Sequence, residues 1–151
     1  MKNKFTEGFY MPGFAKMDEP DMMHTLTELL GPGEMIQAAV YCNYKQTGFF
    51  ANNRNITPGY VAITDKERII GYRRGMLSDG FLELDMGYLT KVKISNGLLG
   101  SKIVYMVFND GKKQEIKFQA GPKIIGGSFP NQAHSLEELI YLLKGRQMLA
   151  L

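Results

Sequence analysis

One amphipathic helix near the end of the chain constrains the fold more than any other feature of the sequence. Apolar side chains recur at the i, i+3, i+4 and i+7 spacing of a single helix face: Leu136, Leu139, Ile140 and Leu143. Ser135 and Glu138 have the spacing of a capping box, and Gly145 is a stop signal. A helix with one apolar face must bury it, and the segments before it resemble strands, so we expect this helix to close a β-sheet.

From Ile36 onward the pattern changes to the two-residue alternation of strands. The first segment, Ile36 to Tyr44, places apolar side chains at every second position. Six further strand-like segments follow, separated by turns, at residues 60–64, 68–72, 81–86, 91–95, 102–108 and 114–119. Short connections make neighbouring strands antiparallel, and alternation predicts one covered and one solvated face. We therefore expect a mainly β chain of about seven antiparallel strands, capped by the C-terminal helix.

The first 32 residues are expected to form an arm and a short helix, ahead of a main domain at residues 33–151. Residues 21–30 carry a partial apolar stripe that predicts a short helix with Asp21 as its cap. The arm before it lacks any period but is rich in aromatic residues, among them Phe5, Phe9, Tyr10 and Phe14. Two interpretations stay open: the arm packs over its own sheet, or it docks on a neighbouring subunit.

Composition excludes several classes of protein. The chain has 151 residues, of which 44% are apolar, so it suits one globular domain rather than a disordered chain. Its net charge of +3 is too mild for a typical nucleic-acid-binding domain, so no nucleic-acid partner is expected. A single cysteine, Cys42, allows no intrachain disulfide. Without an apolar run of membrane-spanning length or a signal-peptide core after Lys2 and Lys4, the expected location is cytoplasmic.

The sequence contains no recognisable catalytic constellation. The histidines His24 and His134 lie in different flanking segments, without ligand-like spacing. Cys42 is placed on the inner face of a strand, where a thiol behaves as a small apolar group. Asp79, Glu83 and Asp85 lie close together, but alternate acids on a strand are typical of a solvated face. We therefore predict a protein that is not an enzyme and that uses no metal or cofactor.

The order of seven strands and one helix resembles the pleckstrin-homology-like (PH-like) superfold. The residues that carry this resemblance are Gly33-Glu34, Tyr60 to Asp65 with Arg68-Ile69-Ile70, Leu89 to Ile94, and Ser135 to Leu143. In detail the chain is most similar to small bacterial PH-like proteins of the YokE type and to GRAM domains, over roughly residues 33–144. The resemblance implies a split barrel and binding rather than catalysis. It also implies assembly, because several bacterial members form rings through sheet edges.

The same resemblance points to the first inter-strand loop, which carries the head-group ligands in lipid-binding PH domains. Here that loop places Lys45 and Arg54 on either side of Phe49 and Phe50. Cations attract anionic lipid and aromatic rings bury apolar area at a membrane surface. The alternative is structural: one ring packs beneath the loop, the other begins a strand, and the cations are solvated.

Three functional hypotheses follow from these patterns. The leading one is a non-enzymatic PH-like module that binds protein, either another chain or a second copy, with the aromatic arm residues as oligomer contacts. The second is peripheral binding of an anionic membrane through the loop at residues 45–54. The third, a small-molecule hydrolase, requires an enclosed polar pocket with converging acids or histidines.

Overall fold

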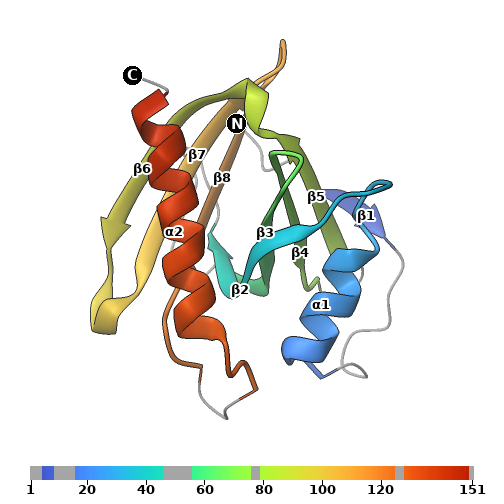
Figure 1. Ribbon diagram of the computed structural model, residues 1–151, viewed down its shortest axis with the longest axis vertical. Helices are drawn as coiled ribbons and strands as arrows, with labels where there is room; N and C mark the ends of the chain where they lie inside the picture. The colour runs from blue at the N-terminus through green and yellow to red at the C-terminus, as the bar shows by residue number, and fades with distance from the viewer. Residues whose placement is uncertain (1–4, 9–15, 46–55, 76–78, 125–127, 150–151) are drawn as a thin grey trace.

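A computed structural model describes residues 5–8, 16–45, 56–75, 79–124 and 128–149 (Figure 1). Within these ranges, eight antiparallel strands form one sheet in the order β1-β5-β4-β3-β2-β8-β7-β6. Their bounds are β1 Thr6–Gly8, β2 Ile36–Lys45, β3 Ile56–Thr64, β4 Arg68–Arg73, β5 Asp79–Asp85, β6 Leu89–Asn96, β7 Lys102–Asn109 and β8 Lys113–Ala120. Single-turn 3₁₀ helices, η1 (Met86–Tyr88) and η2 (Leu98–Gly100), flank β6. The mainly β, antiparallel prediction is confirmed.

The sheet consists of two meanders joined at one place. Strands β2 to β5 pair in sequence order, and so do β6 to β8. Among the described residues, the two groups pair with each other where Asn43, Tyr44 and Lys45 of β2 lie opposite Gln119, Phe118 and Lys117 of β8. Figure 1 shows the two groups diverging from this junction. Short turns explain the pairing of β3 with β4 and of β7 with β8, and the curvature of the sheet leaves a concave side for a helix to cover.

Helix α2 (Gln132–Leu149) covers that concave side. Leu136, Leu139, Ile140 and Leu143 are all buried in the main core, as their spacing predicts. The helix is longer than expected: it begins three residues before Ser135 and continues past Gly145. Its last turn is held by Gln147, whose amide donates to the Val92 carbonyl at 3.2 Å, and by an ion pair between Arg146 and Glu67. These tertiary contacts explain why one glycine does not end the helix.

The expectation of one solvated face is wrong for the middle of the sheet. Residues 59–64 of β3 are all buried, because a second apolar layer covers the other face. Met22 and Leu26 of α1 (Glu19–Thr27) pack there against Tyr60 and Ile70. The Asp21 cap is also wrong: Asp18 caps α1 by accepting from the Asp21 N–H at 2.9 Å. Asp21 instead accepts a hydrogen bond from the Tyr60 hydroxyl at 2.6 Å, which ties α1 to the sheet.

The described part of the N-terminal arm lies against its own chain. Strand β1 pairs with β5, and the Phe5 ring meets the Tyr44 ring edge-on at a centroid distance of 5.0 Å. The Arg73 guanidinium lies 4.7 Å from the centroid of Phe5. The other proposed arm contacts, Phe9, Tyr10 and Phe14, fall outside the described residues, so their role in an oligomer stays a prediction. In the described part of the chain, no helix is both long and apolar enough to cross a bilayer.

Candidate functional site

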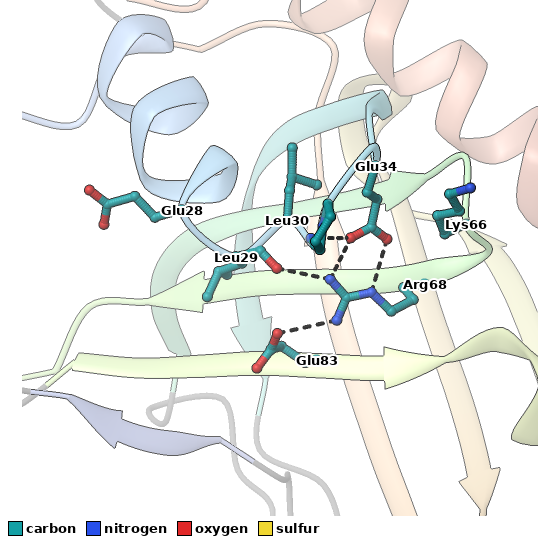
Figure 2. Close-up of a pocket in the computed structure, with 9 residues that line it drawn as sticks. Glu28, Leu29, Leu30, Glu34, Lys66, Arg68 and Glu83 are labelled. Carbon is teal, nitrogen blue, oxygen red and sulfur yellow. Dashed lines mark hydrogen bonds and ion pairs between the residues drawn. The ribbon is translucent and has the colours of Figure 1, made fainter.

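A polar depression on the described surface lies where the turn after α1 meets β4 and β5. It has a volume of about 550 Å³ and is lined by Glu28, Leu29, Leu30, Gly31, Pro32, Glu34, Lys66, Arg68 and Glu83. Figure 2 shows the Arg68 guanidinium between the carboxylates of Glu34 and Glu83, with Glu28 standing apart. A hollow that gathers charged groups is a candidate ligand site. Whether these groups are available to a ligand depends on whether they already bind one another.

The charged groups at the centre of this depression already bind one another. Arg68 Nη2 and Nε donate to Glu34 Oε1 and Oε2 at 2.6 and 2.9 Å. The remaining Glu34 lone pairs accept from Gly31 N–H at 2.8 Å and from the Thr64 hydroxyl at 2.6 Å. Arg68 also donates to the Leu29 carbonyl and to Glu83. This Glu34–Arg68 network joins the α1–β2 connection to β3 and β4, and its partners satisfy each other without a ligand.

The network lowers the pKa of Glu34 from 4.5 to about 2. The hydrogen bond from Arg68 is the main cause and outweighs burial, which acts in the opposite direction; the bonds from Gly31 and Thr64 add to it. The ordinary pKa applies in the unfolded chain, so the ionised carboxylate stabilises the fold fully above about pH 4.5, and this stability disappears as the pH falls toward about 2.

We expect Glu34→Gln to remove most of the acid dependence of stability in that window, because glutamine does not titrate. Urea unfolding at several pH values between about 6 and about 2.5 measures it. Glu83→Gln is the matched control, because the Glu83 side chain contacts the same arginine but is 51% exposed. A Glu34→Gln curve parallel to that of the wild type would contradict the assignment.

The residues considered for catalysis do not converge. His24 lies 3.3 Å from Glu28 on the exposed side of α1, and His134 is exposed on α2. Cys42 is fully buried, and burial raises the pKa of its thiol above the ordinary range, which disfavours the thiolate. Among the residues described, no three His, Cys, Asp or Glu side chains are grouped to hold a metal ion.

The loop predicted as a lipid or partner site lies almost wholly outside the described residues. Lys45 is half-buried at the end of β2 and belongs to the junction with β8, where it pairs with Lys117. Phe49, Phe50 and Arg54 are not among the described residues, so their proposed role stays a prediction.

A second depression, the α2 groove, runs along the N-terminal half of α2. It has a volume of about 480 Å³ and is lined by Gly100, Lys102, Pro122, Ala133, Leu136, Glu137, Ile140, Tyr141 and Lys144. Leu136 and Ile140 supply an apolar floor, whereas Lys102, Lys144 and Glu137 place charges around it. Apolar grooves with a charged rim are common at protein interfaces.

Two leucines project into solvent beside this groove. Leu98 is 84% exposed and Leu99 is 97% exposed, and the next residue, Gly100, lines the groove. We call Leu98 and Leu99 the tip. Tyr141, on the helix side of the groove, is 74% exposed. Isolated apolar side chains on a surface are ordinary, but a concentration of them beside an apolar groove is typical of a binding surface.

The backbone of the tip is also unusual. Leu99 has φ 55° and ψ 38°, the left-handed conformation, which costs an L-residue with a side chain roughly 1–2 kcal/mol. A leucine contributes nothing to folding at a fully exposed position, so neither packing nor backbone preference explains its presence. Leu98 and Leu99 are not among the site residues predicted from the sequence. The available signal was an apolar dipeptide between Gly97 and Gly100, in a turn where polar residues are usual.

Comparison with known proteins adds no relative to this description. No family model, no curated protein and no solved structure matches the chain.

Proposed function

We propose that this chain is a non-enzymatic interaction module of the PH-like class, and that it binds protein through the α2 groove. The PH-like part rests on the sequence resemblance and is supported by the strand order, with a four-strand meander, a three-strand meander and a helix after the last strand. Binding rather than catalysis is supported by the polar depression, whose central charged groups satisfy one another.

The observation that carries the proposal is the exposed tip beside the α2 groove. Exposed leucines leave apolar area in water at a cost of about 25 cal/mol per Å², and a partner that covers them recovers this free energy. The lysines at the groove rim suit polar contacts at the edge of such an interface. Because the tip is no part of the core, binding and folding are separable by mutation.

The proposal predicts that Ala133→Arg abolishes protein binding while the fold is kept. Ala133 is exposed on the wall of the groove, so a long charged side chain there fills the groove without disturbing the core. Immobilised full-length chain is incubated with lysate of its native cell, and retained proteins, including untagged copies of this chain, are identified by mass spectrometry. His134→Arg, the next exposed position, lies outside the groove lining and is the matched control.

Retention by the wild type and by His134→Arg, with loss in Ala133→Arg, supports the proposal. Equal retention by the wild type and both variants contradicts the assignment of binding to the groove. No specific retention by the wild type, of this chain or any other, contradicts the function itself. Thermal unfolding of each variant separates loss of binding from loss of structure.

A further inference from the structure

The tip and the α2 groove are complementary features of one surface. The tip is exposed and apolar, the groove is concave with an apolar floor, and Gly100 connects them, because it follows Leu99 in η2 and lines the groove. A groove of about 480 Å³ lies in the range of roughly 300–1,000 Å³ that accommodates small organic ligands, so side chains of leucine size can enter it. In Figure 1 the β6–β7 turn lies at one end of the molecule, where a neighbour can approach it.

A twofold interface needs this combination, because the same patch must supply both halves of every contact. In such an interface the tip of one copy would enter the groove of the other, and the reverse contact would form at the same time. The charges of the groove rim also suit this pairing. Lys102, Lys144 and Glu137 lie in one lining, so two facing grooves can place the glutamate of each copy opposite the lysines of the other.

Resting on the proposed function, we propose that the occupant of the α2 groove is the tip of a second copy of this chain, in a twofold dimer with two reciprocal contacts. The strained backbone supports this choice. Leu99 keeps a disfavoured conformation that aims its side chain at solvent in a single copy, and strain of this kind is tolerated where the residue has another role. A dimer contact supplies that role.

The proposal predicts that changing either half of the contact gives a monomer. The tip variant is Leu98→Asp with Leu99→Asn, because asparagine tolerates the left-handed backbone and leaves the turn intact. The groove variant is Ala133→Arg. Light scattering after size-exclusion chromatography, with loading up to the order of 100 µM, is expected to show a wild-type dimer and an at least tenfold weaker dimer for each variant. Met35→Asp removes another exposed apolar side chain, at 67% exposure, and is the control that stays a dimer.

Mixing the two variants gives the decisive test. The tip variant has an intact groove and the groove variant an intact tip, so one of the two reciprocal contacts forms between them. Native mass spectrometry of the mixture is expected to show a one-to-one heterodimer that is weaker than the wild-type dimer but stronger than the dimer of either variant alone. A partner of any other kind gives no such recovery.

Each other outcome overturns the proposal in a recognisable way. If the wild type is a monomer over the whole concentration range, the occupant of the groove is not a second copy. If the capture experiment then retains a different protein, the proposed function still stands. A dimer that both variants preserve places self-association elsewhere on the chain. Cosedimentation of a wild-type monomer with phosphatidylserine-containing vesicles, lost in the tip variant, makes the tip a membrane contact instead. Residues 89–108, which include the tip, carry three lysines and no acid, and lysines attract anionic lipid, so the vesicle experiment tests a real alternative.

Discussion

Arg68→Met should lower the free energy of unfolding by about 3–5 kcal/mol, one of the two largest losses we expect from a single substitution. The Glu34 side chain is only 3% exposed, and Arg68 is its cationic partner. Methionine fills similar space but leaves a buried carboxylate with only the Gly31 N–H and the Thr64 hydroxyl as donors. Removing one member of a buried ion pair is costly because the remaining charge has lost its solvation without compensation.

Two further measurements isolate this cause. The double variant Glu34→Gln with Arg68→Met carries no buried charge, so it should be more stable than Arg68→Met alone. The deficit of Arg68→Met relative to the wild type should also shrink as the pH falls from about 4.5 toward about 2. Over this range the wild type loses the stability that its ionised Glu34 contributes, while protonation of Glu34 removes the unpaired charge of the variant. Glu83→Gln, which removes the exposed partner of Arg68, should cost less than about 1 kcal/mol. Urea unfolding that finds Arg68→Met no worse than Glu83→Gln would refute a structural role for the network.

Gly71→Ala should cost about 2–4 kcal/mol, although it adds one methyl group. A Cβ at Gly71 would overlap the hydroxyl of Tyr44, and it would lie 3.1 Å from the Tyr60 carbonyl oxygen. Tyr44 is 2% exposed and donates to that carbonyl at 2.5 Å. The ring cannot move aside easily, because Phe5 and Phe118 pack against it. The methyl group therefore displaces a buried hydrogen bond in a packed core.

Tyr44→Phe should rescue part of this loss, because it removes the oxygen that the new methyl group meets. Alone, Tyr44→Phe should cost about 1 kcal/mol for the lost hydrogen bond. Together the two changes should cost less than the sum of the single variants, by at least about 1 kcal/mol in a double-mutant cycle. Gly145→Ala is the matched control: no atom lies within 4 Å of its Cβ position, so alanine should stabilise helix α2 by roughly 0.5–1 kcal/mol. Additive costs would show that the collision at Gly71 is absent.

Local patterns predicted most of the elements and few of the contacts between them. The alternation along β2 and the spacing of apolar residues in α2 report which side chains face a core. Those predictions hold from Ala38 to Tyr44 and along the helix, whereas Ile36 packs in the second core, because the register of β2 shifts between Ile36 and Ala38. Alternation cannot report a second core. The buried run at residues 59–64 reads almost continuously apolar, which is the signal for a strand covered on both faces. The one-face rule does not hold for such a strand, so the layer under α1 was not predicted.

The candidate surface was less predictable than the fold, for a physical reason. The Glu34–Arg68 network joins residues 34 positions apart, and the α2 groove combines residues 100–102 with residues 133–144. Charge or hydropathy at any one of these positions is unremarkable. The loop at residues 45–54 attracted attention because cations and rings are adjacent there in sequence. The tip did not, because its significance depends on a groove that a distant helix completes.

The sequence by itself determined the antiparallel strands and the closing helix, since side-chain periodicity and short turns act over a few residues and need no knowledge of distant partners. Only the tertiary structure decided how far α2 extends, which sheet faces are covered and what surrounds Leu98 and Leu99. Those outcomes depend on which segments, far apart in the chain, become neighbours when the two meanders join at β2 and β8. Free energies of burial and pairing arise only once that juxtaposition exists.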